Sequence, residues 1–399
     1  APLRGRRIVA IDPGFRTGCK VVALDPGGAL LADGVIYPNE PRRDTVGAMQ
    51  VLMRMIDEYD IDAIALGDRT ASRETEAFLK SAGITDFADL FIVSENGASV
   101  YSASEVARCE FPDKDVTVRG AVSIGRRLID PLAELVKIDP KSIGVGQYQH
   151  DVDQTSLHDA LDFTVTSCVN QVGVDLNTAS PQLLAYISGI GNTMASRIVE
   201  YRTANGPFAS RADLLRVPRL GEKIYKQAAG FLRVPASANP LDNTGIHPES
   251  YHIVERMAAD LGADVASLLA NAALIDRIDP SRYTDFGTAT VADIIAELRK
   301  PGRDPRTDTA NVTFDDSIHS IEDLVTGMIL PGKVNNITAF GAFVDIGIKE
   351  NGLLHISQMS HKRVAEVADI VKINQRLMVK VIDIDLDRRR IALSIKDLL

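Results

Sequence analysis

The sequence predicts a multi-domain α+β protein. Three observations lead to this prediction: apolar residues alternate near both ends, a helical pattern lies between them, and the helical part contains an internal repeat. At 399 residues, 45% of them apolar, the chain is long enough for two to four domains with ample core. We expect four parts, which cover residues 1–150, 151–234, 235–320 and 321–399.

Residues 1–150 are predicted to form a mixed sheet flanked by helices. Strand patterns occupy residues 7–14 and 17–25, and a third strand ends at Tyr37, with turns rich in glycine and proline between them. Helical and strand patterns then alternate, as expected for a sheet covered by helices. The expected helices are 43–59, 72–81, 98–109 and 120–136, and the expected strands are 61–66 and 91–93.

Three acidic residues, Asp12, Asp68 and Glu95, follow strands of this sheet. Carboxylates at neighbouring strand ends could hold the two magnesium ions of a nuclease around a phosphodiester. Such a site also needs an acid from the last helix, where the expected face carries small residues and arginines. We therefore predict a vestigial site with no metal and no catalysis, and Asp12 could equally cap the turn at Gly14.

Residues 151–234 are predicted to be helical. Apolar side chains recur at helical spacing on one face of 156–173, and residues 180–198 then align with residues 210–227 at an offset of 30. Each copy is predicted as helix, tight turn, helix. Positive φ at Gly189 would expose amide groups at the next helix N-terminus, where they can hold a phosphate without reading a base.

The second copy has Arg219 where the first has Gly189, so we expect weaker binding there, or binding through Lys223. The net charge of +4 on residues 174–234 favours phosphate contact. The alternative is a plain αα-hairpin whose glycines only end a helix. The predicted phosphate contacts are Gly189, Gly191, Arg197, Gly221 and Lys223.

Residues 235–320 are predicted to be an acidic helical segment. A stretch rich in Pro, Asn and Ser at 235–243 indicates a linker, residues 248–300 have a helical pattern, and 303–317 is a polar connector. Residues 235–325 carry a net charge of -9, whereas residues 326–399 carry +3. The repeat and the C-terminal part are therefore the segments that could hold a phosphate backbone by charge.

Residues 321–399 are predicted to form a five-stranded barrel that binds unpaired bases. Phe340 and Phe343 would lie on opposite faces of a regular strand, but a bulge at Gly341 would bring both rings outward. Exposed rings near a cation stack bases, which contributes ~1–3 kcal/mol per base. The alternative is a small barrel in which both phenylalanines are core.

The composition limits which cofactors, metal sites and cellular locations we expect. The cysteines Cys19, Cys109 and Cys168 are far apart, which supports neither a disulfide framework nor a zinc site, and we expect no cofactor. There is no apolar run of 18 residues and no signal-peptide pattern. We expect a cytoplasmic monomer without a membrane partner. The chain starts without Met, so we expect a truncated form that lacks an upstream part.

Residues 326–396 resemble the S1 RNA-binding domain, an OB-fold module. The matching motifs are Gly-Lys-Val at 332–334, Phe-Gly-Ala-Phe-Val-Asp at 340–345, Gly-Leu-Leu-His-Ile-Ser at 352–357 and Arg-Ile-Ala-Leu-Ser at 390–394. Because the turn before the last motif is rich in arginine, the motif does not decide whether Arg389 or Arg390 takes the matching position. The resemblance implies a binding face of Phe340, Phe343, His355 and Lys333, with Asp385 and Arg389 or Arg390 beside it.

Residues 174–234 resemble a tandem helix-hairpin-helix, and residues 1–150 resemble a ribonuclease-H-like domain of the YqgF type. Together with the acidic segment and the S1 domain, this order resembles the Tex family of bacterial transcription accessory proteins over essentially the whole chain. Where the family shows Gly-Asn-Gly-Thr, this chain has Gly67-Asp68-Arg69-Thr70. The motifs that carry the resemblance lie at 12–18, 70–76, 95–104, 130–134, 144–151 and 189–191.

The resemblance implies a nucleic-acid-binding transcription accessory factor without catalytic activity. The expected partners are single-stranded RNA or DNA, with duplex as a further candidate, and RNA polymerase or ribosome-associated machinery. Two alternatives remain: a metal-dependent, structure-specific nuclease that uses Asp12, Asp68 and Glu95, and a protein-interaction scaffold, which the acidic segment favours.

Overall fold

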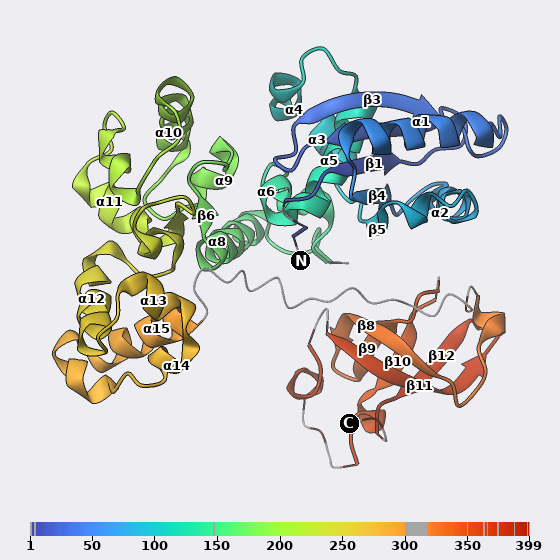
Figure 1. The fold of residues 1–399 in the computed structure, drawn as a ribbon. Helices are drawn as coiled ribbons and strands as arrows, with labels where there is room; N and C mark the ends of the chain where they lie inside the picture. The colour runs from blue at the N-terminus through green and yellow to red at the C-terminus, as the bar shows by residue number, and fades with distance from the viewer. Residues whose placement is uncertain are drawn as a thin grey trace. The chain divides into compact units, whose positions relative to one another are not determined.

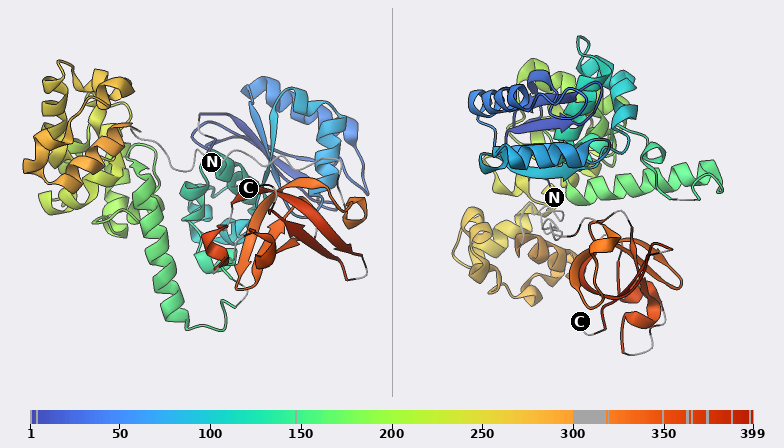
Figure 2. Two further views of the ribbon diagram at one scale, coloured as in Figure 1. Left: turned by 90° about the horizontal axis from the view of Figure 1, so that it is seen from below. Right: turned by 90° about the vertical axis from the view of Figure 1, so that its right-hand side faces the viewer.

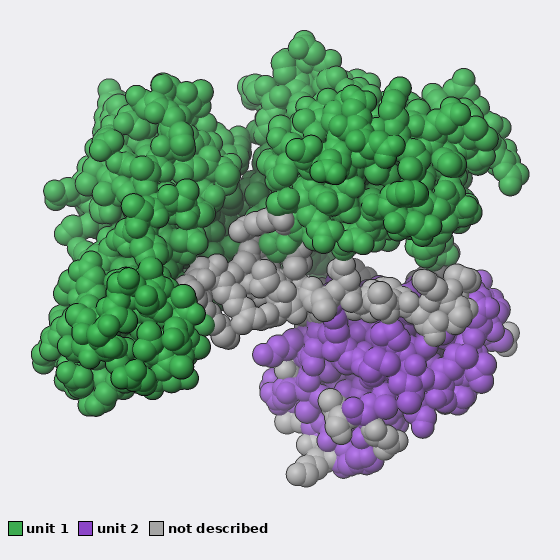
Figure 3. All heavy atoms as spheres, in the orientation of Figure 1, with its two compact units in different colours: residues 1–308 green, residues 309–399 purple. Residues whose placement is uncertain are grey.

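The computed structural model describes residues 2, 3, 5–146, 148–299, 318, 320–348, 350–361, 364, 366–372, 375–386, 388–396 and 398. The chain divides into two compact units, residues 1–308 and 309–399, which Figure 3 shows in different colours. A mixed sheet with helices in the first unit and a closed barrel in the second confirm the predicted α+β class. The predicted connector at 303–317 lies outside the described residues, and the predicted domain boundaries remain predictions.

The first unit begins with a five-stranded sheet in the order β3-β2-β1-β4-β5 (Figure 1). β1, β2 and β3 pair antiparallel, whereas β4 runs parallel to β1 and β5 runs parallel to β4. The carboxyl ends of β1, β4 and β5 therefore lie at one edge of the sheet. The bounds of the strands are β1 Ile8–Asp12, β2 Cys19–Leu24, β3 Leu30–Ile36, β4 Ala63–Gly67 and β5 Asp89–Val93.

Helices cover both faces of this sheet, so its central strands are buried on both sides. On one face, Leu52 of α1 (Thr45–Tyr59) and Leu79 of α2 (Ser72–Ser81) share a core with Val9. On the other face, α5 (Val116–Ile129) approaches closely because Gly125 has no side chain. A Cβ atom at Gly125 would lie 2.9 Å from the Cβ atom of Ala10.

The prediction of one continuous helix over 98–109 was wrong. The segment forms α3 (Ala98–Ala103) and α4 (Glu105–Glu110), which meet at Ser104 in an extended conformation. The Ser104 hydroxyl accepts a hydrogen bond from the Ala107 backbone N–H at 3.1 Å. Serine in this position starts a new helix rather than continuing the previous one. The domain ends with α6 (Pro131–Leu135) and α7 (Pro140–Ile143).

The predicted helix over 156–173 is present as α8 (Gln154–Val172), but little of it is buried. Val169 is its buried residue, Cys168 is exposed, and the Phe163 side chain is 76% exposed. Both views of Figure 2 show α8 running clear of the neighbouring helices over much of its length. Among the helices of the described residues, none combines the length and apolarity that a membrane crossing requires.

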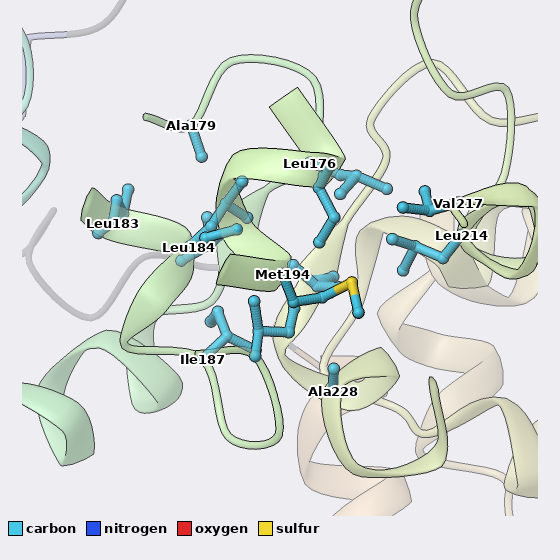
Figure 4. Packing of buried hydrophobic residues seen from close by; sticks show 14 of the residues in the cluster. Leu176, Ala179, Leu183, Leu184, Ile187, Met194, Leu214, Val217 and Ala228 are labelled. Atoms are coloured by element: carbon cyan, nitrogen blue, oxygen red, sulfur yellow. The ribbon is translucent and has the colours of Figure 1, made fainter. Parts of the chain in front are cut away.

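The internal repeat forms one compact core. Leu184 and Met194 from the first copy meet Leu214 and Ala228 from the second copy, as Figure 4 shows from close by. A short parallel pair, β6 (Val174–Asp175) with β7 (Leu232–Arg233), closes this module. Its helices are α9 Pro181–Ala185, α10 Asn192–Asn205, the 3₁₀ helix η2 Arg211–Arg216 and α11 Glu222–Ala228.

The acidic segment folds into a separate helical core that includes Leu241, Met257, Leu268 and Ile294. The helices predicted over 248–300 are confirmed, with short breaks between them. Their bounds are α12 Tyr251–Asp260, α13 Val265–Ala270, α14 Ala272–Ile275 and α15 Thr288–Arg299.

The second unit is a closed five-stranded barrel in the order β10-β12-β11-β8-β9, which confirms the predicted barrel. Its interior is filled by alternating apolar residues such as Leu330, Val334, Val344, Val379 and Leu393. The bounds of the strands are β8 Ile329–Thr338, β9 Gly341–Asp345, β10 Gly352–His355, β11 Arg376–Asp385 and β12 Arg390–Ser394.

Candidate nucleic-acid interface

The outer face of the barrel presents an aromatic cluster. Phe343 pairs with Leu353 of β10, and Ala342 and Val344 on either side of it point into the core. Side chains alternate along a strand, so Phe343 points outward. The Phe340 ring is 49% exposed and lies edge-on to Phe343, with ring centroids 6.3 Å apart and planes at 87°. The two rings therefore form one open surface.

The predicted bulge is at a different position. β9 pairs with β10 without a register shift, so Gly341 is not bulged, and Phe340 lies just before the strand. Gly341 is required for close packing instead, because a Cβ atom there would lie 3.0 Å from the His355 Cα atom. Next to the rings, a register shift lies instead in β8, between Val334 and Asn336, opposite Phe343.

His355 ends β10 beside the rings. It pairs with Gly341, next to Phe340, and its side chain is exposed. Its Nδ1 atom lies 2.8 Å from the Ser357 hydroxyl and accepts the Ser357 backbone N–H at 3.2 Å. An Nδ1 atom that accepts leaves Nε2 to carry the proton. His355 therefore presents an N–H donor at the end of the aromatic surface.

Charged residues lie around the aromatic cluster. Lys333 pairs with Asp345 across β8 and β9, and with Arg376 across β8 and β11. Asp385 pairs with Arg390 of β12. Ala392, two residues after Arg390 on the same strand, pairs with Leu353 of β10. The register thus places Asp385 and Arg390 on the outward sheet face that also carries Phe343.

The two arginines of the turn differ. Arg389 adopts a left-handed backbone with φ 49°, and its guanidinium forms an ion pair with Glu350 at 2.7 Å. Arg390 lies in β12 and forms no ion pair among the residues described here. The geometry therefore favours Arg390 over Arg389 as the arginine beside the binding face.

The first hairpin has an uncapped helix N-terminus. Gly189 has φ 87°, and a Cβ atom there would lie 2.9 Å from the Gln227 Cβ atom, so a side chain would disturb the packing on α11. Gly191 is the N-cap of α10, where no side chain satisfies the first amide groups. A Cβ atom at Gly191 would meet nothing within 4 Å. The N-terminus of α10 is thus open to an anion.

The second hairpin keeps this geometry despite its different sequence. Arg219 adopts φ 67°, close to the value of Gly189, and Gly221 is the uncapped N-cap of α11. Arg219 and Lys223 are both exposed, and Arg197 of α10 is half-buried. The left-handed conformation costs a non-glycine residue about 1–2 kcal/mol, so Arg219 is held there by the surrounding fold.

The carboxyl edge of the sheet brings Asp12, Asp68 and Glu95 near one another. The Asp68 carboxylate accepts the Glu95 backbone N–H at 3.0 Å, and Glu95 accepts the Arg69 backbone N–H at 3.4 Å. Among the residues described, no three His, Cys, Asp or Glu side chains are arranged to hold a metal ion. Asp68 and Glu95 therefore each bind a backbone amide of the other's loop, which ties the loops after β4 and β5 together.

Burial and mutual repulsion raise the pKa of carboxyl groups at this edge of the sheet. Burial, with the Asp12 carboxylate nearby, raises the pKa of Glu95 to about 7. Burial also raises the pKa of Asp12, although Lys20 opposes the shift. Gly120 of α5 faces this edge, since a Cβ atom there would lie 3.4 Å from Asp12 Oδ2. The position opposite Asp12 therefore carries no fourth acid.

The arginines near this edge differ from one another. Arg127 is buried and donates to the backbone carbonyl groups of Ser94 and Asn96 at 2.7 and 2.8 Å, so it clamps the loop that carries Glu95. Arg126 instead forms an ion pair with Glu110 and donates to the Gly28 carbonyl at 2.8 Å. Arg126 is therefore engaged by Glu110 and the Gly28 carbonyl rather than by the carboxylates at this edge.

Four family models match successive parts of the chain. They are described as "Tex protein YqgF-like domain" over residues 6–129, "Helix-hairpin-helix motif" over 169–233, "HHH domain" over 239–306 and "S1 RNA binding domain" over 324–396. The chain is 50% identical to "Protein tex" of Bordetella pertussis over 402 residues, which cover 99% of this chain and 51% of that protein. The chain belongs to the Tex family.

Further relatives extend the family match. "Transcriptional accessory protein Tex" of Neisseria gonorrhoeae is 49% identical over 401 residues, covering 99% of this chain and 52% of that protein. The human "S1 RNA-binding domain-containing protein 1" is 36% identical over 467 residues, covering 99% of this chain and 46% of that protein. The chain thus spans about half the length of the curated relatives it matches.

The sequence predicted the acidic segment only as helices, whereas the "HHH domain" model matches residues 239–306 there. The missed signal is a glycine turn: α12 and α13 are joined through Gly262, which has φ 68°. The Asp264 side chain caps α13 by accepting the Ser267 backbone N–H at 2.7 Å. The Asp264 carboxylate thus occupies the N-terminus of α13, unlike the open N-terminus of α10.

Proposed function

We propose that this chain is a non-catalytic nucleic-acid-binding part of a transcription accessory factor. The barrel stacks the bases of a single strand on Phe340 and Phe343, and the first two hairpins hold phosphates of the backbone. The observation that carries the proposal is the open pair of rings, because adjacent apolar side chains exposed on a surface mark a binding site. Duplex nucleic acid is a further candidate ligand for the hairpins, and RNA polymerase or ribosome-associated machinery are candidate partners.

On the barrel, we propose that His355 and Lys333 flank the bases and that Asp385 and Arg390 line the continuation of the same face. Arg389 contributes through its ion pair with Glu350, which fixes the turn. On the hairpins, the amide groups at Gly191 and Gly221 contact phosphates, with Arg197, Arg219 and Lys223 adding positive charge. Contacts of this kind give salt-dependent binding with little sequence preference.

Binding curves would test the proposal directly. We expect fluorescence anisotropy with labelled single-stranded RNA, single-stranded DNA and duplex DNA to show the tightest binding for a single strand. Raising the salt concentration should weaken the binding of each ligand. If the whole chain binds none of the three at low salt, the proposal is wrong.

For the hairpins, we expect Gly191→Pro, which removes one exposed amide, to weaken binding about threefold for every sequence alike, because backbone contacts carry no base information. Gly191→Ala keeps the amide and has free space around its methyl group, so it is the matched control.

Lys223→Glu should reduce the slope of log affinity against log salt by about one. An unchanged slope would assign the repeat to protein contacts or to a purely architectural role.

We also infer that the carboxyl edge of the sheet is catalytically silent. The expected result is no cleavage of single-stranded, duplex or branched substrates in magnesium or manganese, and unchanged binding in Asp12→Asn. The physical reason is that two-metal hydrolysis needs ligands on both sides of the phosphate, and Gly120 supplies none. Cleavage that disappears in Asp12→Asn would instead support the nuclease alternative.

The Glu95 carboxyl predicts a particular pH dependence of stability. Burial raises the pKa of Glu95 from the ordinary 4.5 to about 7, so the folded state binds a proton more tightly than the unfolded state. Stability contributed by this group is present below about pH 4.5 and falls as the pH rises to about 7. Glu95→Gln should flatten this fall, as measured by thermal unfolding between pH 5 and pH 8. An unchanged pH profile would show that Glu95 ionises normally.

A further inference from the structure

Asn336 lies in β8 directly opposite the outward-facing Phe343. We propose that Asn336 selects among the bases that stack on Phe343, by donating a hydrogen bond to a carbonyl oxygen on the base edge. The favoured bases are therefore uracil, cytosine and guanine, which carry such an oxygen, over adenine, which carries none. The proposal rests on the proposed function, since it presupposes that a base stacks on the ring.

The bulge in β8 brings Asn336 to this face. Val334 pairs with Val344, and both side chains are buried in the barrel. The next pair is Asn336 with Phe343, so Asn335 is the extra residue. In a regular strand Asn336 would share the inward direction of Val334, because side chains two apart lie on one face. The extra residue reverses that direction and places Asn336 outside.

The residues around Asn336 agree with this assignment. Asn335 and Asn336 are both exposed, whereas Ile337 pairs with the buried Ala342 and packs against the barrel core. Directly opposite residues in an antiparallel pair have Cβ atoms ~4.5–5.5 Å apart. The Asn336 side chain is therefore a direct neighbour of Phe343, within reach of the edge of a base stacked on that ring.

The hydrogen bonds fix which end of the amide faces the base. The Asn336 carbonyl oxygen accepts the Ile337 backbone N–H at 2.9 Å. Its NH₂ group, which can only donate, has no acceptor among the described residues. Asn335 is different, because its NH₂ group donates to the Asn351 side chain at 3.3 Å. Asn336 thus offers a free donor beside the stacking surface, and Asn335 does not.

The test compares two single-stranded RNAs, a ten-nucleotide oligouridine and a ten-nucleotide oligoadenosine, by fluorescence anisotropy with the whole chain. Asn336→Ala should weaken oligouridine binding about fivefold, the expected loss for one neutral hydrogen bond, and oligoadenosine binding less than twofold. Asn335→Ala is the matched control and should change both by less than twofold. Asn336→Asp, which keeps the acceptor for Ile337 and removes the donor, should lower the oligouridine to oligoadenosine affinity ratio in the same direction.

Two outcomes would overturn the proposal. An equal loss for both RNAs in Asn336→Ala would assign the donor to a phosphate, and no loss for either would remove it from the interface. Failure of the proposed function would show differently: the unaltered chain would bind neither RNA, or Phe343→Ala would leave both affinities unchanged.

Discussion

Replacing both Phe340 and Phe343 by alanine should weaken the binding of a single strand at least tenfold. Stacking contributes ~1–3 kcal/mol per base, and the two rings offer surfaces for two bases. The barrel should stay folded without the two rings, since Phe340 is 49% exposed and Phe343 points outward from β9. The measurement is fluorescence anisotropy with a labelled single-stranded RNA, together with a thermal unfolding curve for each variant.

Met378→Ala is the matched control for this double variant. Its side chain is 48% exposed, close to the value for Phe340, but it lies on β11, opposite Pro331 of β8. We expect less than a twofold change in affinity. A folded double variant that binds as well as the unaltered chain would show that the rings are not the stacking surface, and the single-strand proposal for the barrel would then be wrong.

The second large effect is on stability and concerns Arg211. This arginine is the first residue of the 3₁₀ helix η2 in the repeat, and it is fully buried. Its guanidinium donates to the carbonyl groups of Leu232 and Ile246 at 2.8 and 2.7 Å, and to the Tyr251 hydroxyl at 2.7 Å. It also donates to the Thr244 carbonyl. One side chain therefore joins the second hairpin to the start of the acidic helices.

Arg211→Met should destabilise the first unit by about 3–5 kcal/mol, because it leaves several buried polar groups without their partner. Asp242 would lose a neighbouring positive charge, although it keeps its hydrogen bonds from Ser237 at 2.7 Å and Tyr251 at 2.8 Å. The measurement is urea unfolding of the whole chain, with limited proteolysis to locate the loosened segment.

Arg216→Met is the control for this substitution. It lies in the same 3₁₀ helix, its side chain is 72% exposed, and it pairs with Asp213 at 3.3 Å. An exposed ion pair contributes ~0–1 kcal/mol, so little change is expected. Equal, small effects of both substitutions would show that the Arg211 hydrogen bonds do not hold the two helical modules together.

The sequence predicted those parts of the fold that follow from local periodicity and turn chemistry. Strands β1 and β4 are short apolar runs, and the repeat shows its hairpins through glycine at fixed spacing. The role of Arg211 could not be predicted in the same way. Its partners lie 21 to 40 residues away, so only the packing of two helical modules shows why a charged side chain is buried.

The candidate site was predicted in part. The binding-face positions of Phe343 and His355 could be predicted because each residue lies in a strand pattern that also carries a recognisable motif. The position of the bulge could not, since a register shift depends on which residues pair across two strands. Gly341 drew attention as a bulge candidate, yet its role is to let β9 approach β10. Asn336 was missed for the same reason.

Hydrogen–deuterium exchange of the whole chain, with and without a single-stranded oligouridine, tests the central claim most directly. We predict slower exchange in β9 and β10, around Phe343 and His355, and a smaller effect at the start of α10 near Gly191. The RNA should remain intact in magnesium throughout. Protection confined to the sheet edge around Asp12 and Glu95, with cleavage of the RNA, would contradict the account.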